Sequence, residues 1–578
     1  MSENAPRGRV AGVNGNMVSV AFDTRVIQNE VAYVCSGAAR LKAEVIRVRG
    51  READLQVFES TEGIVVGDAV EFSGELLSVE LGPGLLTQVF DGLQNPLPNL
   101  ARQAGHFLQR GLYLYPLDTE RAWAWTPTAA LGAGVRSGET LGTVPEGLFE
   151  HRIMLPFAWT GSWRVTWVAP AGALTIKDTV AKVSCENEER LVTMVQSWPV
   201  KIPISSYRTK VLPTEPLVTQ QRIIDTFFPV AKGGTFCTPG PFGAGKTVLQ
   251  HALSQHSQVD VVIVAACGER AGEVVELLRE FPHLEDPRTG RNLIDRTIII
   301  CNTSSMPVAA REASIYTSVT LAEYYRQMGL NCLLLADSTS RWAQALREMS
   351  GRLEEIPGEE AFPAYLESLV AGFYERAGLV ELHDGSYGSI TIGGAVSPAG
   401  GNFEEPVTQA TLKVVGCFLG LSRDRANARR YPAIHPLESW SKYGSVVEAA
   451  PVARARRLLK QGNEVAQMMK VVGEEGTLTS DFVVYLKSEF LDSVYLQQNT
   501  FDRTDGASSA ERQRHVFGKV VQLLDTAFAF ADKAAARACF HKLRQHFVDW
   551  NYAPWGSDEF RGGEQAIDTL LAATAAKA

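Results

Sequence analysis

The sequence predicts a multidomain chain made of two β-rich modules, a central α/β domain with a mainly parallel sheet, and an α-helical C-terminal domain. The chain has 578 residues, more than a domain with a single hydrophobic core usually contains. Short Val-rich runs give way along the chain to long apolar runs alternating with helical patterns, and finally to helical patterns alone. Hydrophobic residues make up 45% and charged residues 21%, as in ordinary globular proteins.

The first part of the chain has the pattern of a small β-barrel. From residue 8 to about 76, runs such as GRVAGV, MVSVAF and AEVIRV alternate with Gly, Asn and Asp turn signals. We assign residues 1–76 to an N-terminal β-barrel and residues 77–109 to a linker that joins the central domain. Runs such as WAWTP, LGTVPE and GSWRVTWV, separated by Gly and Pro, predict an inserted β-rich module over 110–195.

The pattern changes after the second β-rich module. Between 196 and 445, continuous apolar runs such as VDVVIVAAC, RTIIICNTS and NCLLLAD alternate with helical patterns such as AGEVVELLREF. Continuous apolar strands separated by helices are typical of a parallel α/β sheet. Residues 446–578 are helical in pattern, as in PVARARRLLKQGNEVAQMMKVV, and predict a helical bundle.

A glycine-rich loop opens the central domain. GPFGAGKT, at 240–247, fits the phosphate-binding pattern G-x-x-x-x-G-K-[ST] and lies between a short β-run and a helical pattern. Backbone N–H groups of such a loop surround a phosphate chain, Lys246 reaches the β- and γ-phosphates, and the Thr247 hydroxyl ligates Mg²⁺. A chance match is the alternative, which the flanking strand and helix disfavour. The predicted nucleotide-binding residues here are Gly240, Pro241, Phe242, Gly243, Ala244, Gly245, Lys246, Thr247 and Val248.

Two further apolar runs end in residues suited to nucleotide hydrolysis. NCLLLAD ends in Asp337, which we expect to help hold Mg²⁺; the alternative is an ordinary helix cap. VDVVIVAAC leads into Glu269 and Arg270. At the carboxyl end of a parallel strand, where ligands bind, Glu269 would orient the attacking water and Arg270 would stabilise charge on the γ-phosphoryl oxygens. The alternative is a solvated Glu–Arg pair on a surface loop.

Charge and cysteine usage restrict the class of protein. The formal net charge of −9 disfavours a general nucleic-acid binder, which needs many Lys and Arg residues. Eight cysteines without a CxxC pair indicate small core residues in a reducing compartment. The start, MSENAPRGRV, lacks the apolar stretch of a signal peptide, and no apolar run approaches the ~20 residues that span a bilayer. We expect a cytoplasmic protein, peripheral to a membrane through other subunits.

Several long motifs carry a family resemblance. GPFGAGKT, NTSSMPVAAREASIYTSVTLAEYYR, LLLADSTSRWAQALREMSGRLEEIP and GGAVSPAGGNFEEPVTQATL resemble the catalytic A subunit of the vacuolar- and archaeal-type rotary ATPases, in its bacterial form, over nearly the whole chain. The resemblance implies a RecA-like central domain. It also implies ATP hydrolysis or synthesis in a hexamer of alternating A and B subunits, with stalk subunits and a membrane sector that moves H⁺ or Na⁺.

The resemblance also implies roles for single residues. Lys246 and Thr247 match the phosphate lysine and magnesium hydroxyl, Glu269 the water-activating glutamate, Arg270 a γ-phosphate arginine, and Asp337 and Arg341 the DSTSR segment near the phosphates. Arg341 as a surface charge at a helix start is the alternative. Tyr431 matches the aromatic on the adenine ring, and Phe242 is typical of this subunit; core packing is the alternative for both. Gln498 and Phe501 lie where the C-terminal domain closes over the base.

The sequence departs from the family pattern in places. The usual GERGNE reads here as Gly268-Glu-Arg-Ala271-Gly272-Glu, which removes a side chain capable of hydrogen bonding near the site. Gln220 stands where the TGxR motif has glycine. Ala244 replaces the redox-switch cysteine of eukaryotic relatives, so a disulfide-controlled loop of that kind is excluded.

The resemblance implies that the site is incomplete without a partner. Non-catalytic sister subunits supply an arginine finger, whereas this chain has Ser-Trp-Ser-Lys at 439–442, so the finger must come from the B subunit. The acidic run RLEEIPGEE at 352–360 either faces a basic central stalk or is a solvated loop. Rival functions are a non-catalytic ring subunit, a flagellar-type export ATPase and a Rho-type RNA translocase. The translocase would need basic residues interleaved with aromatics near the N-terminus, and these are missing.

Overall fold

The computed structural model describes residues 7–105, 109–186, 188–398 and 401–575. The first six and last three residues, with which the predicted barrel begins and the helical domain ends, lie outside this range. The chain divides into two compact units. The first unit comprises Met1–Leu212, Val259–Val396 and Glu404–Val414, and the second comprises Pro213–Gln258, Ser397–Phe403 and Val415–Ala578.

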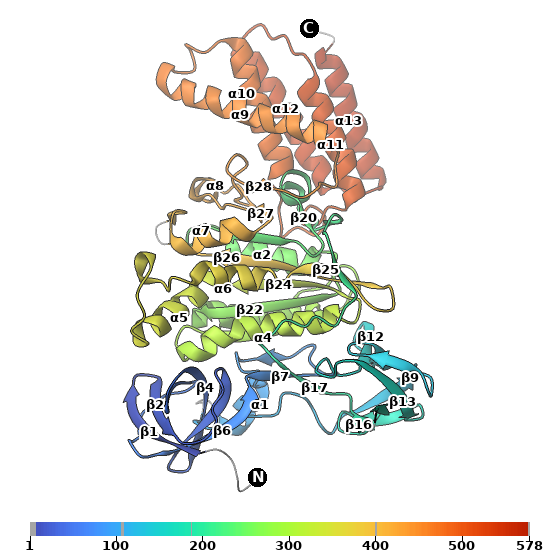
Figure 1. The fold of residues 1–578 in the computed structure, drawn as a ribbon. Helices are drawn as coiled ribbons and strands as arrows, with labels where there is room; N and C mark the ends of the chain where they lie inside the picture. Colours follow the sequence, from blue (N-terminus) through green and yellow to red (C-terminus); the bar gives the residue numbers. More distant parts are fainter. Residues whose placement is uncertain (1–6, 106–108, 187, 399–400, 576–578) are drawn as a thin grey trace. The chain divides into compact units, whose positions relative to one another are not determined.

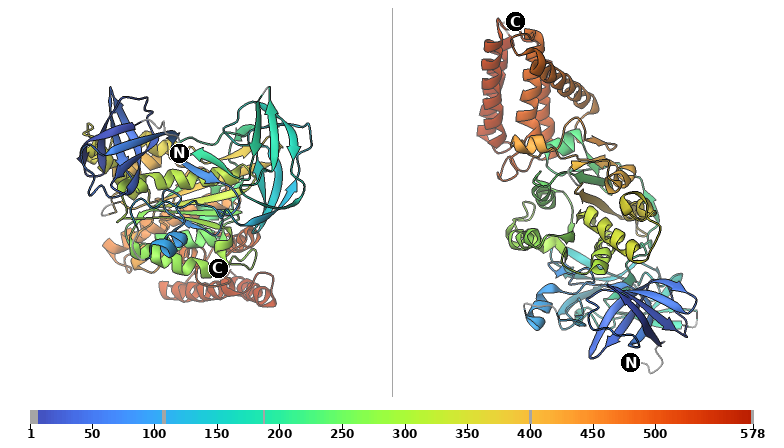
Figure 2. Two further views of the ribbon diagram at one scale, coloured as in Figure 1. Left: turned by 90° about the horizontal axis from the view of Figure 1, so that it is seen from below. Right: turned by 90° about the vertical axis from the view of Figure 1, so that its left-hand side faces the viewer.

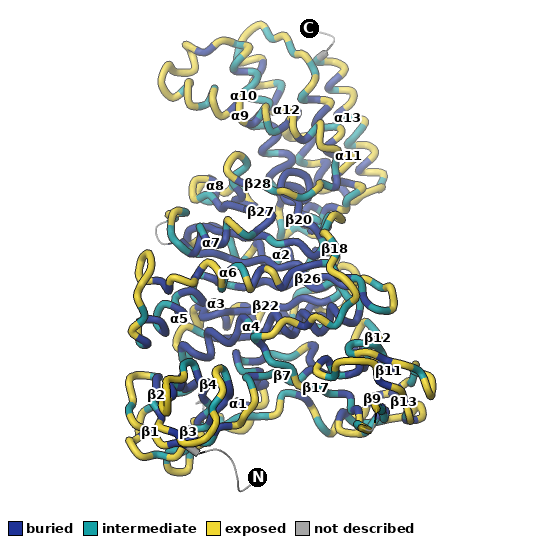
Figure 3. The backbone as a smooth tube through the Cα atoms, viewed as in Figure 1, coloured by how far each residue is buried: buried dark blue, intermediate teal, exposed yellow. Residues whose placement is uncertain are grey.

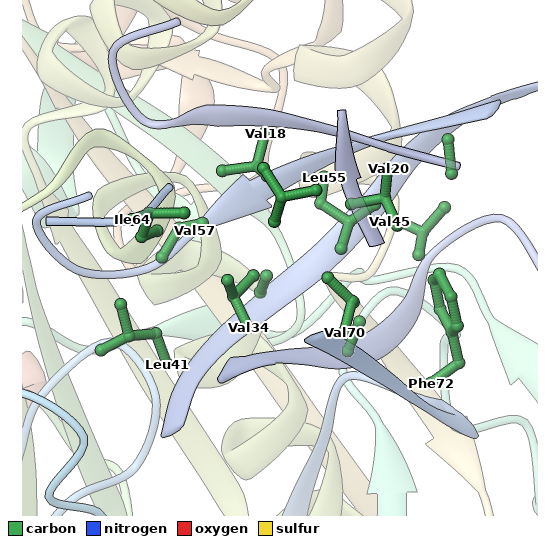
Figure 4. Packing of buried hydrophobic residues seen from close by; sticks show 14 of the residues in the cluster. Val18, Val20, Val34, Leu41, Val45, Leu55, Val57, Ile64, Val70 and Phe72 are labelled. Atoms are coloured by element: carbon green, nitrogen blue, oxygen red, sulfur yellow. The ribbon is translucent and has the colours of Figure 1, made fainter. Parts of the chain in front are cut away.

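The first unit begins with a closed antiparallel barrel in the strand order β1-β2-β5-β4-β3-β6 (Figure 1). Apolar side chains alternate along these strands, so one face of each strand fills the barrel interior. The interior holds Val18, Val34, Val45 and Leu55, each fully buried (Figure 4). The strands are β1 (Arg7–Asn14), β2 (Met17–Phe22), β3 (Glu30–Ser36), β4 (Ala39–Arg49), β5 (Glu52–Val57) and β6 (Ala69–Leu76).

The second β-rich module consists of two four-stranded sheets, in the orders β10-β13-β15-β16 and β12-β11-β9-β14 (Figures 1 and 2). Trp123, Trp125 and Trp163 are buried within it, which explains the tryptophan-rich runs of this segment. Its strands are β9 (Ala122–Pro127), β10 (Gly134–Arg136), β11 (Thr140–Glu146), β12 (Phe149–Met154), β13 (Ser162–Val168), β14 (Gly172–Thr175), β15 (Ala181–Cys185) and β16 (Glu188–Val192).

The α/β part of the first unit is built on parallel strands in the order β26-β24-β22-β23-β8. The nine residues of β22 (Val261–Glu269) are all buried, as a strand covered on both faces requires (Figure 3). The other strands are β8 (Val89–Phe90), β23 (Thr297–Thr303), β24 (Asn331–Asp337) and β26 (Tyr387–Val396), with β25 (Gly378–Glu381) antiparallel to β26 and β18 (Thr209–Val211) antiparallel to β25. β8 comes from the segment predicted as a linker, and it forms the edge of this sheet.

Helices and short strands complete the first unit. The helix α4 (Val308–Arg326) is almost entirely buried and packs on β22, β23 and β24. The remaining helices are α1 (Leu97–Ala104), α3 (Ala271–Glu280), α5 (Thr339–Arg352), α6 (Leu366–Tyr374) and α7 (Pro406–Val414), with short helical turns at Phe281–His283, Leu293–Arg296 and Glu359–Ala361. A two-stranded sheet joins β7 (Ser78–Leu81) to β17 (Gln196–Pro199).

The second unit combines a small strand region with a helical domain. Strand β21 (Thr235–Pro239) pairs in parallel with β27 (Cys417–Phe418), and β28 (Trp440–Ser441) is antiparallel to β27. The short strands β19 (Pro216–Leu217) and β20 (Val230–Ala231) pair with each other. The helices are α2 (Lys246–His256), α8 (Arg423–Asn427), α9 (Ala449–Val472), α10 (Thr479–Leu491), α11 (Ala510–Asp525), α12 (Lys533–Tyr552) and α13 (Asp558–Ala575), with π-helical turns η1 (Ile223–Phe227) and η6 (Asp492–Leu496).

The long helices of the second unit pack side by side. Helix α9 packs on α10, α10 on α12, and α12 on α13 (Figure 1). Phe490, Phe540 and Phe547 form their aromatic core. Within the described residues, no helix is both long enough and apolar enough to cross a membrane. The predicted fold class, with barrel, β-rich module, parallel α/β domain and helical C-terminal domain, is confirmed.

Candidate nucleotide site

The glycine-rich loop lies between the end of β21 and the start of α2. Gly243 and Gly245 have φ angles of 78° and 85°, in the left-handed region that favours glycine, which explains why the motif spaces glycines this way. The Nζ of Lys246 donates hydrogen bonds to the carbonyl oxygen of Gly240, at 3.1 Å, and to the hydroxyl of Ser397. The loop therefore curves back around the lysine ammonium group.

The start of α2 has the properties of an anion-binding helix end. Gly245 is its N-cap residue and supplies no side-chain acceptor to the amides of the first turn. Those amides and the positive end of the helix dipole favour a negatively charged group. Thr247 is half-buried and Val248 exposed in this first turn, whereas Pro241 and Ala244 before it are buried.

Aromatic rings are exposed in the same unit. A Cβ atom built on Gly245 would lie 3.4 Å from Cε1 of Tyr431, so this ring lies directly against the glycine-rich loop. Tyr431 is 40% exposed, Phe242 73% and Phe501 86%. Side chains this exposed are not packed in a hydrophobic core, and aromatic rings are suited to stacking on a base.

Gln498 is arranged differently from these aromatic residues. It is only 3% exposed. Its amide Nε2 donates to the carbonyl oxygens of Gln220 and Asp505, and its Oε1 accepts from the backbone N–H of Arg222. Its own backbone N–H donates to the carbonyl oxygen of Tyr431 at 2.8 Å. Gln498 is thus placed to hold the loop that follows α8, residues 428–433 (the Tyr431 loop). The amide of Gln498 is already occupied by backbone groups.

In the first unit, two carboxylates lie at the carboxyl ends of neighbouring parallel strands. Glu269 is the last residue of β22 and is 9% exposed, and Asp337 is the last residue of β24. These strands are parallel neighbours with Ala266 beside Asp337, so both end at the same sheet edge. Arg270, exposed, is the N-cap residue of α3. The N-cap residue of α5 is Ser338, directly after Asp337.

Cys267 and Arg341 lie at this same edge. Burial and, to a lesser extent, the nearby carboxylates of Asp337 and Glu269 raise the pKa of the Cys267 thiol to about 12, although a hydrogen bond from Ser314 acts in the opposite direction. This thiol is therefore protonated and unreactive at neutral pH. Arg341 is half-buried in the first turn of α5, where its guanidinium donates to Oε1 of Gln344 at 3.4 Å.

The structure adds two residues that the sequence analysis did not assign. Ser397 follows β26 and accepts the hydrogen bond from Lys246, although its only sequence signal was its place in the GGAVSPAGG motif. Arg311 of α4 is 6% exposed and lies across Gly268, next to Glu269. Its guanidinium donates to the carbonyl oxygen of Ser304 at 3.1 Å. A helix interior position gave no signal for this role.

The predicted site residues thus fall into two groups, one in each compact unit. The second unit brings together the glycine-rich loop, Lys246, Thr247 and Tyr431, with Gln498 behind Tyr431. The first unit brings together Glu269, Arg270, Asp337 and Arg341 at the carboxyl ends of its parallel strands.

Comparison with known protein families accounts for most of the chain. Residues 220–441 match the nucleotide-binding domain of the ATP synthase alpha/beta family, residues 114–201 the barrel-sandwich domain of the alpha/beta subunits, and residues 10–74 the beta-barrel domain of that family. The V-type ATP synthase alpha chain of Treponema denticola is 64% identical over 98% of this chain and 96% of its own length. The chain belongs to the V-type ATP synthase alpha chain family.

Other relatives agree with this assignment. The V-type ATP synthase alpha chain 1 of Treponema pallidum is 64% identical over 98% of this chain and 96% of its own length. The corresponding alpha chain of Borrelia garinii is 60% identical over 98% of both chains. The resemblance proposed from the sequence motifs is therefore confirmed. Since the three family domains follow one another in the predicted order, the inserted β-rich module corresponds to the barrel-sandwich domain of this family.

Proposed function

We propose that this chain is the catalytic subunit of a rotary ATP synthase or ATPase, which makes or hydrolyses ATP in step with ion movement through a membrane sector. Membership of the V-type alpha chain family confirms the prediction of such an enzyme, and it does not favour a non-catalytic ring subunit, an export ATPase or an RNA translocase. The single observation that carries the catalytic role is the glycine-rich loop folded around Lys246, in a chain that also places Glu269 at a strand end.

The residues of the second unit fit a nucleotide triphosphate. The left-handed glycines turn the loop so that the uncapped amides of α2 and the Lys246 ammonium group surround one anionic position. Tyr431, with its exposed ring against Gly245, would stack on adenine, and Phe242 and Phe501 offer further exposed aromatic surface. We assign ATP and ADP as the ligands of this loop.

We also assign Mg²⁺ to the site, bound together with the nucleotide. Within the described ranges there is no cluster of three or more His, Cys, Asp or Glu side chains that could hold a metal ion. This agrees with Mg²⁺, which is commonly held by one or two protein groups together with substrate phosphates and water. The Thr247 hydroxyl and the Asp337 carboxylate are the groups we assign to it. When bound, Mg²⁺ neutralises charge on the β- and γ-phosphates.

Each of these protein groups has its own role in phosphoryl transfer. Lys246 holds the terminal phosphates by charge-assisted hydrogen bonds. The Glu269 carboxylate orients the attacking water and accepts hydrogen bonding from it, while Arg270 and Arg341 stabilise the charge that spreads over the γ-phosphoryl oxygens. Little covalent chemistry falls to the protein in this reaction, so positioning and charge dominate.

The proposal includes a partner chain. The segment 439–442 reads Ser-Trp-Ser-Lys and therefore offers no arginine to a neighbouring site. Trp440 and Ser441 form β28, and the Lys442 ammonium group lies 5.3 Å from the centroid of the Trp440 ring. We assign the arginine finger to the B subunit of an alternating hexamer. Central and peripheral stalk subunits and a membrane sector complete the complex, which places this chain at the cytoplasmic face of the membrane. The acidic run 352–360, largely exposed, would face the central stalk.

An ATPase assay tests this proposal. The isolated chain should bind Mg-ATP but hydrolyse it slowly, and adding the B subunit should raise turnover by ~10³ to 10⁵ because an arginine finger contributes that much. A B subunit whose finger arginine is replaced by alanine is the matched control and should give no increase. Full turnover by the isolated chain would contradict the need for a partner, and failure of the chain to bind Mg-ATP would contradict the nucleotide site.

A further inference from the structure

One short segment of the helical domain contacts the Tyr431 loop through the first and the last residue of the segment. The segment 492–498 consists of the π-helical turn η6 and two following residues. At its start, the Asp492 carboxylate accepts hydrogen bonds from Arg425 at 2.8 Å and from Arg430 at 2.6 Å. At its end, the backbone N–H of Gln498 donates to the carbonyl oxygen of Tyr431 at 2.8 Å. π-helical turns of this kind are frequent at functional sites.

One of the ion pairs at the start of the segment, that between Arg425 and Asp492, is shielded from water. The side chains of Arg425 and Asp492 are 9% and 6% exposed. Arg430, directly before Tyr431 in the chain, also pairs with Glu489 of α10 at 2.9 Å. Asp492 is buried, so removing Arg430 leaves its charge with one partner fewer, and the Arg430–Asp492 pair thereby links the position of the loop to the segment 492–498.

The polar contacts of Arg430 lie next to a pocket of the second unit. This pocket, of about 220 Å³, lies beside Arg430 and is also lined by residues of α9 and α10. Arg425, Arg430 and Asp492 all line it, together with Asn463 of α9. This pocket gives the part of the loop at Arg430 space into which it can shift when the ion pairs are removed.

We propose that Asp492, together with Arg425 and Arg430, forms a clamp that positions Tyr431 against the glycine-rich loop and thereby sets the affinity of the site for the nucleotide base. The three side chains are positioning residues, since they act through Tyr431. This inference rests on the proposed function, in which Tyr431 stacks on adenine. It predicts that the clamp affects binding of the base and leaves binding of the phosphate chain unchanged.

Two ligands separate these effects in the full-length chain. Mg-ATP carries both base and phosphates, whereas Mg-tripolyphosphate carries phosphates only. In Asp492→Asn and in Arg430→Met, calorimetric titration should show Kd for Mg-ATP raised about tenfold and Kd for Mg-tripolyphosphate unchanged. Arg537→Met is the matched control, because it removes the exposed ion pair of Arg537 with Glu474 elsewhere in the helical domain. This control should bind both ligands like the wild type.

A double variant tests whether the clamp acts through Tyr431. In the Tyr431→Ala background, adding Arg430→Met should give no further loss of Mg-ATP affinity. An additive loss, an equal loss for both ligands, or unchanged Mg-ATP affinity in Arg430→Met would overturn the clamp while leaving the proposed function in place. If the wild-type chain binds neither ligand, the proposed function fails and the clamp fails with it. Arg430, which is 35% exposed, gives a variant that folds even if the more buried Asp492→Asn does not.

Discussion

The Nζ of Lys246 lies 3.1 Å from the carbonyl oxygen of Gly240, six residues earlier in the chain. With the further hydrogen bond to Ser397, the lysine occupies the centre of the glycine-rich loop. A phosphate group bound at this loop would replace neutral acceptors with charged ones, and charge-assisted hydrogen bonds are roughly twice as strong as neutral ones. We therefore propose that the positive charge of Lys246 contributes to binding of the triphosphate.

Replacing this lysine should therefore remove both binding and turnover. Lys246→Met keeps much of the side-chain length but removes the charge, and we expect turnover of the assembled enzyme to fall at least about a hundredfold, as for loss of a transition-state charge contact. ATPase rates and Mg-ATP titration measure the effect. Lys232→Met, which removes an ion pair with Glu215 in the same unit, is the control and should change neither. Retained Mg-ATP affinity in Lys246→Met would contradict this arrangement.

Glu269 should be required for turnover and dispensable for binding. In Glu269→Gln the side chain keeps its shape but loses the negative charge that orients water, so we expect turnover to fall ~10² to 10⁴-fold while Kd for Mg-ATP stays within about twofold. Single-turnover hydrolysis and titration distinguish the two. Glu276→Gln, an exposed position on the following helix α3, should behave like the wild type. Normal turnover in Glu269→Gln would show that another group activates the water.

Gly268, just before Glu269, should tolerate no side chain. Its φ is 88°, and a Cβ built on it would lie 2.6 Å from Cδ of Arg311. Gly268→Ala should therefore move Arg311 or the Glu269 backbone and lower turnover by about tenfold or more, since small displacements of catalytic groups are costly. Gly290→Ala separates this effect from backbone strain alone, because Gly290 also has a positive φ, of 67°, but no neighbour within 4 Å of an added Cβ. Equal ATPase losses in both variants would argue against the contact with Arg311.

The parts of the site that the sequence could predict are those that depend on local pattern. The glycine spacing before Lys246 and the apolar runs that end at Glu269 and Asp337 are contiguous signals, and each of these residues lies at the loop or strand end that its pattern indicates. The order of the domains could be predicted for the same reason, since strand and helix periodicities extend over many residues.

Contacts between distant segments could not be predicted in this way. Arg311 contacts Gly268 although more than 40 positions separate them in the sequence. Asp492 contacts Arg430 across a sequence separation of 62 residues. Gln498 was expected near the base from resemblance alone, whereas its amide is bound to backbone groups of three other residues. Such pairings depend on tertiary packing, which leaves no periodic trace in a single sequence. The edge strand β8 has only two residues, which is too short for a periodic signal in the sequence.

Asp225 should make the stability of the second unit depend on pH. It is 1% exposed, and burial raises its pKa from 3.8 to about 6, although hydrogen bonds from Thr219, Gln513 and Gln220 oppose the shift. An acid whose pKa is higher in the folded state binds more protons when folded. Its contribution to stability is therefore fully present below about pH 4 and is lost as pH rises through about 6.

The total change for this group is on the order of 3 kcal/mol, of which on the order of 1 kcal/mol is lost between about pH 5 and pH 7. Asp225→Asn cannot titrate, so the difference in melting temperature between the wild type and this variant isolates the carboxyl group from the other acids of the chain. We expect the wild type to lose stability relative to Asp225→Asn as pH rises over that interval. Because Asp178 is an exposed acid whose pKa is lowered, mainly by backbone hydrogen bonding to Thr175, Asp178→Asn is a control that should show no such loss. A constant difference between the wild type and Asp225→Asn from pH 5 to 7 would mean that Asp225 titrates outside this range.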